Sequence, residues 1–340
     1  MTRDEAVHPD VAAPAAGNHT TATPVPTPET LDDLDRALVE RLRLDGRETN
    51  RALAQALGVN EVTVAARLRR MEQHSIMRVV AVTDMRIFGH REFAYACLRV
   101  SEKPAAKVGA DVAALPEVVA VTISTGRYDV IAPILGRDHR HLAELFGTTL
   151  PCIAGVDEVR GLLALDVLKF DSKWALLSAD PGATPDAQPS PTVDALDIAI
   201  IGKLQIDARR SNRSIAADLG VSEGTIRTRI KHLTTERVIK IQAVSDVLAF
   251  GIGAHAYVGI KTHGGSADQV AHALIAREDI AQLSRTLGEF DLVAVAVAPT
   301  REQLVSALID EISQIPGVRR TETFETYATT KHTYAWSWLV

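Results

Sequence analysis

The chain has 340 residues, of which 46% are hydrophobic and 4% aromatic, so it can form several domains with cores built mainly from Ala, Val, Leu and Ile. It holds no run of 18 apolar residues, and its first residues are polar and rich in Pro, Thr and Ala, which argues against a membrane span and a secretory signal. The formal net charge of −6 argues against nucleic acid as a partner, yet nine Arg stand against eight acids over 31–79, and nine Lys and Arg against six acids over 193–240, so positive charge gathers in two segments.

An internal repeat organises the chain. LDDLDRALVERLRLDGRETNRALAQALGVN, beginning at Leu31, matches VDALDIAIIGKLQIDARRSNRSIAADLGVS, beginning at Val193, and the offset of 162 residues persists without a gap as far as Trp174 and Trp336. Chance similarity does not keep register over such a length, so the two copies are predicted to share one fold. The predicted boundaries are a disordered leader over 1–30, helical modules over 31–84 and 193–246, mixed α/β domains over 85–177 and 247–340, and a Pro-rich linker over 178–192.

Each copy begins with a predicted three-helix module. The first helix is indicated by leucines at helical spacing, at Leu31, Leu34, Leu38 and Leu42. A second helix is predicted over Asn50–Leu57, with Asn50 as its N-cap and Gly58 as a left-handed C-cap. A third helix starts at Asn60, or at Ser222 in the second copy. Its predicted buried face consists of Val64, Leu68 and Met71 in the first copy and Ile226, Ile230 and Leu233 in the second.

Two helices joined by a glycine turn, the second with a basic outer face, are typical of a helix-turn-helix. Arginine side chains reach phosphates or guanine edges in the major groove, and threonine reaches either phosphates or bases. One such helix alone is as easily a solvated surface helix, but two aligned copies favour DNA. The predicted DNA-contacting residues are Thr63, Arg67, Arg69, Arg70, Ser222, Thr225, Arg227, Arg229 and Lys231. Since Arg227 stands where the first copy has Ala65, we expect non-identical half-sites and stronger DNA binding by the second copy.

The mixed domain of the first copy has the pattern β-α-β-β-α-β, which indicates a ferredoxin-like sandwich and an α+β fold. After a strand at Met77–Val82, the predicted elements are a strand at Phe93–Val100, a helix at Ala105–Leu115, strands at Val118–Ser124 and Tyr128–Leu135, a helix at Asp138–Leu150 and a strand at Glu158–Lys169. Pro133 interrupts one strand and cannot donate a ladder hydrogen bond, so that strand is expected to be irregular or to lie at an edge.

The hairpin STGRYDV and its counterpart TLGEFDL carry the most distinctive residues of these domains. Gly126 and Gly288 permit a tight turn, and Asp129 and Asp291 begin the following strand. A carboxylate there can hold the ammonium group of a ligand, whereas spacing alone favours the alternative that Asp caps the turn.

Together these motifs resemble the Lrp/AsnC (feast/famine) family of transcription regulators. The resemblance rests on the segment from Leu31 to Arg47, NRALAQALGVN with the basic helix after it, Phe88-Gly89, TGRYD and Ala154–Val156, all of which recur in the second copy. It implies a tandem repeat of winged helix-turn-helix and ferredoxin-like effector domain, in which the effector domains dimerise and bind small ligands, usually amino acids, near the hairpin. It makes Gly126, Tyr128, Asp129, Gly288, Phe290 and Asp291 the ligand-binding candidates.

The resemblance also implies the partners. They are double-stranded DNA, a small-molecule effector and further copies of the chain, although two fused units can form an intramolecular pseudo-dimer. We expect a cytoplasmic bacterial regulator with no catalytic residues, cofactor, metal site or membrane contact. Cys97 and Cys152 lie in apolar runs and are predicted to be core residues, which fits a reducing compartment. His139 and His141 are two residues apart on a predicted helix and make a poor metal pair.

Two alternatives stay open. Siroheme decarboxylases, enzymes of tetrapyrrole metabolism, share this fold and can be fused as two units, but VTISTGRYDV lacks the His-Asn-Tyr type of stretch expected there. A regulator that acts through protein contacts, with weak DNA affinity, is the second alternative. Salt-dependent binding to duplex DNA distinguishes that alternative from a DNA reader, because phosphate contacts release counterions.

Overall fold

The computed structural model describes residues 31–177 and 192–337, so the predicted leader (1–30) and nearly all of the predicted linker (178–192) lie outside the described residues. The first copy contains α1 Asp33–Leu44, α2 Asn50–Leu57, α3 Glu61–Gln73, β1 Met77–Asp84, β2 Glu92–Val100, α4 Ala105–Ala113, β3 Ala120–Thr125, β4 Val130–Gly136, α5 His139–Glu144, β5 Val156–Phe170 and β6 Trp174–Ala175. The second contains α6 Ala195–Ile206, α7 Asn212–Leu219, α8 Glu223–Thr235, β7 Ile239–Asp246, β8 Ala254–Thr262, α9 Ala267–Ile275, β9 Ile280–Leu287, β10 Leu292–Ala298, α10 Arg301–Ser306, β11 Val318–His332 and β12 Trp336–Ser337.

The tandem α+β fold is confirmed. The recognition helices α3 and α8, and the long strands β5 and β11, begin and end at residues exactly one repeat apart in the numbering. Helices α5 and α10 each continue through a turn of π-helix, Leu145–Thr149 and Ala307–Glu311, so even an irregularity recurs. Equal sequence register has therefore produced equal backbones.

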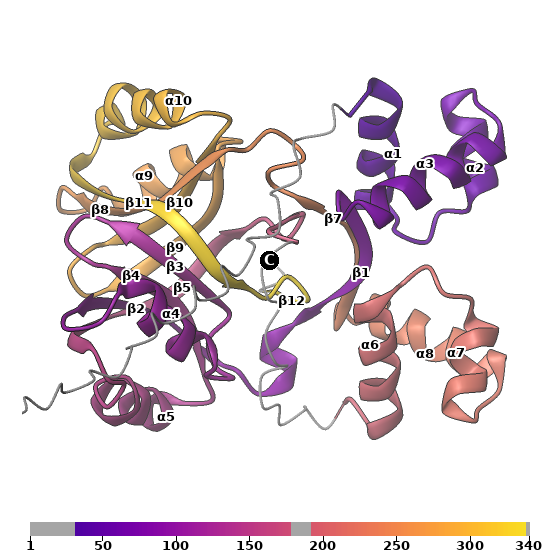
Figure 1. The fold of residues 1–340 in the computed structure, drawn as a ribbon, viewed down its shortest axis with the longest axis horizontal. Helices are drawn as coiled ribbons and strands as arrows, with labels where there is room; N and C mark the ends of the chain where they lie inside the picture. Colours follow the sequence, from indigo (N-terminus) through magenta and orange to yellow (C-terminus); the bar gives the residue numbers. More distant parts are fainter. Residues whose placement is uncertain (1–30, 178–191, 338–340) are drawn as a thin grey trace, which may run out of the picture.

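The two effector domains form one closed barrel, with strand order β10-β8-β11-β3-β4-β2-β5-β9. The copies join at two seams, where β5 pairs with β9 (Leu163 opposite Leu287) and β3 pairs with β11 (Thr125 opposite Glu325). Closure leaves no free sheet edge in the barrel. Helices α4 and α5 cover the half contributed by the first copy, and α9 and α10 cover the other half (Figure 1).

The barrel interior is filled by side chains from both copies. The Tyr95 hydroxyl lies 2.8 Å from the Ser284 hydroxyl, and Tyr95 meets Tyr257 edge to face at 6.2 Å between ring centroids. Nearer one end, Phe324 packs against the rings of Tyr128 and Phe290. The sheets therefore face each other as two halves of one core, and their packing makes the chain an intramolecular pseudo-dimer.

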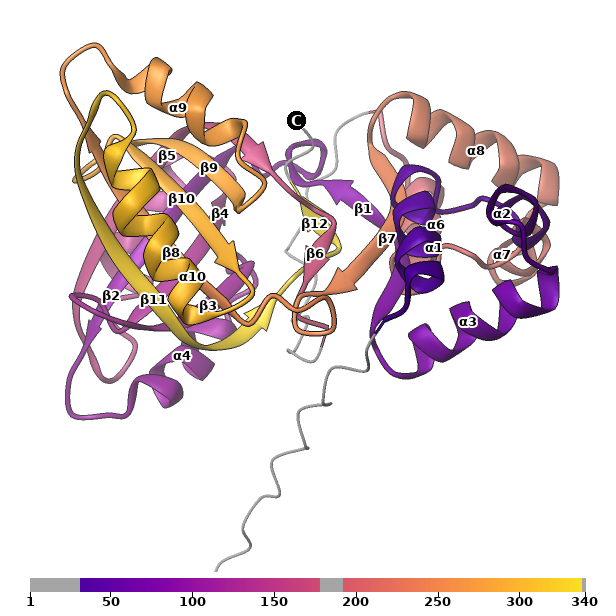
Figure 2. The ribbon, with the colours of Figure 1, turned by 90° about the horizontal axis from the view of Figure 1, so that it is seen from above.

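A second sheet, four-stranded and ordered β12-β1-β7-β6, joins the barrel to the helical modules (Figure 2). Its centre is the antiparallel pair β1–β7, which runs from Met77 opposite Ser245 to Thr83 opposite Ile239. The strand that follows each helix-turn-helix therefore finds its partner in the other copy. The amide of Gly46 donates to the Ile241 carbonyl at 3.2 Å, and the equivalent amide of Ala208 donates to Val79 at 2.9 Å, so each helical module is also tied to the other copy's strand.

Three local predictions have different outcomes in the structure. The N-cap of α2 is Thr49, which has the extended backbone of a cap and whose hydroxyl accepts from the Ala52 amide, and not Asn50, which is already helical. Cys97 is buried as predicted, but Cys152 is exposed, because it lies in the turn between the π-helical segment and β5. Pro133 lies within a continuous β4, which pairs with β2 along its whole length. The side of β4 on which Pro133 lacks an N–H faces β3, and the ladder between β4 and β3 is short.

Candidate nucleic-acid interface and ligand site

The two helix-turn-helix units lie together at the end of the molecule farthest from the barrel (Figures 1 and 2). Helix α2 ends at Gly58, in the left-handed region at φ 67°, and α7 ends in the same way at Gly220. The third helices then begin at N-caps Asn60 and Ser222, whose side chains accept from the Thr63 and Thr225 amides. Turn and cap together fix the angle between the two helices, which is the geometry of a DNA-reading unit.

Thr63 and Thr225 use their hydroxyls within this cap. The Thr63 hydroxyl lies 2.9 Å from Asn60 Oδ1, and that of Thr225 lies 2.8 Å from the Ser222 hydroxyl. Both threonines are half-buried. Their first role is therefore to hold the start of the recognition helix.

Three of the predicted DNA-contacting arginines, which are 31–37% exposed, form ion pairs with the first helix of their own module, so they do not point freely outward as expected. Arg67 and Arg70 both donate to Asp35, a fully buried carboxylate on α1, and Arg67 also pairs with Asp32. In the second copy Arg229 pairs with buried Asp197 at 3.0 Å and with Asp194 at 2.6 Å. A long side chain can leave the helix on one face and bend back to the preceding helix, which spacing along the sequence does not reveal.

The remaining predicted contacts are outward. Arg69 and Lys231 occupy equivalent exposed positions and form no ion pair with another described residue. Arg227 has 70% of its side chain exposed and makes only a surface pair with Glu223, one turn before it, at 3.2 Å. Surface pairs of this kind are worth well under about 1 kcal/mol, so Arg227 is available to a phosphate or base.

Further basic residues on this end were not predicted. Arg51 and Arg213 are exposed at the starts of α2 and α7, and Arg78 and Lys240 are exposed on the paired strands β1 and β7. Each pair is one repeat apart. The available signal was this recurrence of a basic residue at equivalent positions outside the recognition helix.

Arg47 and Arg209 lie at equivalent positions in the turn after the first helix of each unit, and their side chains contact the protein itself. Arg47 donates to the carbonyl of Arg210 at 2.8 Å, and Arg209 donates to the carbonyl of Glu48 at 3.0 Å and to Asn50 at 2.7 Å. Burial lowers the pKa of both guanidinium groups, yet each remains the donor its partners require. The two arginines therefore interlock the helix-turn-helix units of the pseudo-dimer.

The hairpin aspartates bind their own protein. Asp129 accepts the Val100 amide at 2.8 Å. Asp291 accepts the Thr262 amide at 2.8 Å and the Lys261 ammonium at 3.1 Å; burial acts to raise the pKa of Asp291, and these donors outweigh it and lower the pKa. Each carboxylate thus fastens the hairpin to the end of a neighbouring strand. Gly126 and Gly288 adopt φ 128° and 141°, which a side chain would strain.

The two hairpins meet at one end of the barrel. Arg127 lies 2.6 Å from Glu289 and pairs with Glu322 at 2.9 Å, and the Tyr128 hydroxyl donates to Glu289 at 3.2 Å. Burial acts to raise the pKa of Glu289, but the Arg127 hydrogen bond outweighs it and lowers that pKa. Arg127 and Glu289 are equivalent residues, so the contact joins the copies across their pseudo-twofold axis.

A hollow of about 640 Å³ opens beside this contact. It is lined by Arg99, Arg127, Tyr128, Glu158, Arg160, Gly161, Leu162, Gly288 and Glu289. It brings together the predicted ligand residues Tyr128 and Gly288, whereas Gly126, Asp129 and Asp291 lie outside its lining and Phe290 is packed in the barrel core. The hollow offers both charges, which suits a zwitterion.

Among the described residues, no helix is long and apolar enough to cross a membrane, and no cluster of three His, Cys, Asp or Glu side chains is arranged to hold a metal ion.

Two protein-family models match the chain, each of them twice. The AsnC-type helix-turn-helix domain matches residues 31–72 and 193–234, and the Lrp/AsnC ligand binding domain matches residues 94–174 and 255–336.

Curated relatives match one copy at a time. HTH-type transcriptional regulator FL11 of Pyrococcus abyssi is 34% identical over 143 residues, which are 42% of this chain and 94% of that protein. HTH-type transcriptional regulator Ptr1 of Methanocaldococcus jannaschii is 31% identical over 127 residues, 37% of this chain and 86% of its own length. Both relatives are archaeal and carry the length of a single unit, so this chain corresponds to two of them in tandem.

A solved structure resembles the whole tandem. The siroheme decarboxylase NirDL superposes with a TM-score of 0.64, covering 88% of this chain and 93% of its own, at 15% sequence identity. Likeness at that identity shows a shared two-unit fold and nothing about chemistry.

Proposed function

The chain belongs to the Lrp/AsnC family of helix-turn-helix transcriptional regulators, and from that premise we propose that one chain reads two adjacent half-sites on duplex DNA and that a small ligand at the barrel modulates this binding. The observation that carries the proposal is the arrangement of the two recognition helices at one end of a single pseudo-dimer, held by the β1–β7 ribbon. Two-fold related helix-turn-helix units bind half-sites about one helical turn apart, roughly 34 Å.

The second copy supplies more of the DNA contacts in this proposal. After the internal ion pairs are set aside, α8 keeps Arg227 and Lys231 on its exposed face, while α3 keeps Arg69. The first copy has Ala65 where Arg227 stands. Different side chains at one docking position read different bases, so the half-sites differ in sequence.

Capture of sheared genomic DNA followed by sequencing tests the DNA-binding function. Wild type is compared with Arg227→Ala/Lys231→Ala, and with Arg140→Ala as a matched control that removes a positive charge from the exposed surface of α5. We expect enriched sites for wild type and the control, and loss of enrichment in the double variant. Equal enrichment in all three proteins, or none from folded wild type, contradicts the proposal.

An amino acid in the hollow beside the hairpins is the proposed effector. Arg99 and Arg160 suit its carboxylate, and Glu158 and Glu289 suit its ammonium group, because each is a charge-assisted hydrogen-bonding pair. Tyr128 and Gly288 line the hollow, and Gly126, Asp129, Asp291 and Phe290 act by holding the hairpins in place. Further assembly of chains around this end is part of the proposal, because the hollow is open to solvent there.

Calorimetric titration with the standard amino acids tests the effector site. A bound amino acid is expected to lose at least tenfold in affinity in Arg160→Ala and to be unaffected by Arg140→Ala. DNA affinity and oligomeric state are measured with and without the amino acid. If no amino acid binds at millimolar concentration, the effector assignment fails while the DNA-reading function stands.

Enzymatic decarboxylation of a siroheme-type substrate is the rival function, because the NirDL fold match covers the tandem. That match is one of fold alone at 15% identity, whereas both family models and the curated relatives are those of transcriptional regulators. Regulation therefore stands as the proposed function.

A further inference from the structure

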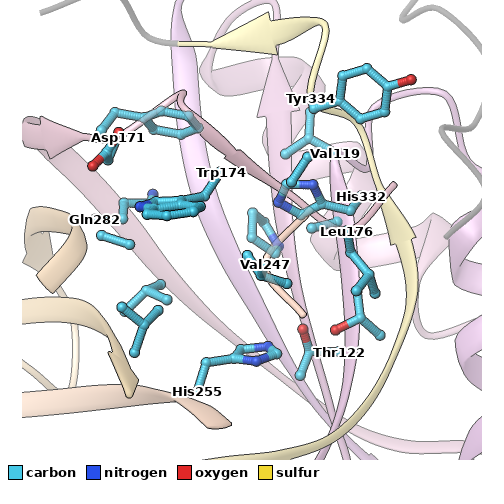
Figure 3. Close-up of a pocket in the computed structure, with 18 of the residues that line it drawn as sticks. Val119, Thr122, Asp171, Trp174, Leu176, Val247, His255, Gln282, His332 and Tyr334 are labelled. Atoms are coloured by element: carbon cyan, nitrogen blue, oxygen red, sulfur yellow. The ribbon is translucent and has the colours of Figure 1, made fainter. Parts of the chain in front are cut away.

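A cavity of about 140 Å³ lies at the end of the barrel opposite the hairpins, beneath the four-stranded sheet that carries the helix-turn-helix units. Its walls come from the ends of the barrel strands. Its roof comes from residues that lead into or out of that sheet, which are residues 171–172 and 174–176, Val247, Ile252 and residues 333–334. Figure 3 shows Trp174, His255, His332 and Thr122 around one central space. Most of the lining is aromatic or aliphatic.

The cavity lies on the pseudo-twofold axis, because both copies contribute equivalent residues to it. Phe93 of the first copy is equivalent to His255 of the second, and Phe170 is equivalent to His332. All four line the cavity. Two identical subunits would present the same residue from both sides, so this chain has an apolar face and an imidazole face that a homodimer cannot form.

Two imidazoles of this cavity lack hydrogen-bond partners. Within the described residues the half-buried side chains of His255 and His332 form no hydrogen bond, and His332 Nδ1 is shielded from solvent without a partner. Other polar wall groups are engaged: Gln282 donates to the Tyr95 hydroxyl at 2.9 Å, and the Ser172 hydroxyl accepts from Gln242 at 2.9 Å. Burial lowers the pKa of each imidazole to about 4, so both are uncharged at neutral pH and can each donate once and accept once.

An unpaired buried imidazole costs free energy that a ligand hydrogen bond recovers. The size of the cavity limits the ligand, since a dry apolar cavity of about 150 Å³ accommodates benzene. A charge is disfavoured, because the lining holds one carboxylate, Asp171, which is already paired with Lys173, and no cation. The remaining class is an uncharged aromatic ring with one polar hydrogen.

We propose that this cavity is a second ligand site, specific for a small uncharged aromatic molecule that bears a hydroxyl or a ring N–H, with the ring against Phe93, Phe170 and Trp174 and the polar group on His255 or His332. The site is independent of the amino-acid hollow, which lies at the other end of the barrel. It requires neither DNA binding nor an amino-acid effector.

Calorimetric titration of the full chain at pH 7.5 tests the site with phenol and indole as probes. Benzene, which lacks the polar hydrogen, and benzoate, which is charged, are the comparison molecules. We expect one molecule of phenol or indole to bind per chain. Benzene should bind at least tenfold more weakly than phenol, and benzoate should show no measurable binding.

Variants locate the binding. His255→Phe/His332→Phe copies the first copy's residues onto the second and is expected to reduce phenol affinity to that of benzene while benzene affinity changes less than threefold. His139→Phe, on the exposed surface of α5, is the matched control and leaves both unchanged. Ala281→Leu fills the cavity and abolishes binding of both probes; its fold is verified by circular dichroism and gel filtration.

The proposal is overturned if neither phenol nor indole binds at millimolar concentration, if phenol affinity is unchanged in the double histidine variant, or if benzoate competes with phenol. Loss of phenol binding in Arg160→Ala also overturns it, because the probe would then occupy the hollow beside the hairpins. Should Ala281→Leu fail to fold, the comparison of phenol and benzene in the histidine variant still decides the question.

Discussion

The two helix-turn-helix units share a backbone but use their arginines differently. In the first unit Arg67 and Arg70 both neutralise buried Asp35, whereas in the second Arg229 alone neutralises Asp197, because His232 stands where the first unit has Arg70. On the outer face the second unit has Arg227 where the first has Ala65. The first copy thus directs more of its positive charge inward and the second more of it outward.

Fusion of the copies explains how such differences persist. In a homodimer a residue near the twofold axis faces its own copy, so like meets like. Here Arg127 meets Glu289, its equivalent, and phenylalanines face histidines across the cavity. Each copy can therefore diverge while the pair remains complementary.

The first prediction concerns the arginines that pair with buried carboxylates. Among the described residues Arg229 alone places a guanidinium on Asp197, so Arg229→Ala leaves a buried carboxylate uncompensated and should lower the unfolding free energy more than the loss of Arg67 does. Arg67→Ala should cost about 1 kcal/mol, because Arg70 still pairs with Asp35. Denaturant unfolding of both variants measures the difference. Equal losses of unfolding free energy would contradict the difference between the two helix-turn-helix units.

Acid should distinguish the histidine face from the phenylalanine face. Burial lowers the pKa of His255 and His332 from 6.5 to about 4, so between these values the unfolded chain binds protons that the folded chain does not. Stability therefore falls as the pH decreases from 6.5 to 4.

We expect His255→Phe/His332→Phe to reduce that loss by about 4 kcal/mol, roughly 2 from each imidazole. Denaturant unfolding at pH 7 and pH 4.5 provides the measurement. The other titratable groups facing the cavity, Asp171, Tyr257 and Tyr334, are common to both proteins and cancel in the difference. Identical pH dependence in wild type and variant would mean that the imidazoles are not buried uncharged.

The contact between the hairpins should show a coupling of about 1 kcal/mol, since the pair is partly exposed. Arg127→Glu places three carboxylates together, with Glu289 and Glu322, and should lower the melting temperature. Adding Glu289→Arg restores opposite charges and should recover part of the loss. A double-mutant cycle measures the coupling; additive effects would show that the hairpins do not depend on each other.

The last prediction on single variants concerns DNA binding. Arg227→Ala should lower affinity for a bound duplex about tenfold, and Ala65→Arg should raise it severalfold, because one contact to a base or phosphate is worth about 1–3 kcal/mol. Fluorescence anisotropy at fixed salt measures both. Both variants should unfold like wild type, since neither position contributes to the module core; unchanged affinity in both would exclude this position from the interface.

Sequence periodicity predicted the units well and their joining poorly. The buried faces of α3 and α8, the left-handed cap at Gly58 and the order of strands follow from local rules that one segment obeys by itself. The pairing of β1 with β7 across the copies does not, because a strand pattern specifies a strand and not its partner.

The candidate sites were predicted in kind but not in every residue. Arg67, Arg70 and Arg229 have the spacing of outward residues, and only the position of Asp35 and Asp197 on the preceding helix explains why they turn inward. Likewise, the replacement of Phe93 by histidine in the second copy is visible in the aligned repeat, but its meaning depends on the cavity that the barrel encloses.

Selection of bound duplexes from a random library, with the full chain, tests the central claim most directly. One chain that presents two different recognition helices should select an asymmetric site, with two dissimilar half-sites centred about 10–10.5 base pairs apart, and Arg227→Ala should relax the sequence of one half-site only. Selection of a perfect palindrome, an equal effect of Arg227→Ala on both half-sites, or no selected sequence at all would contradict the account.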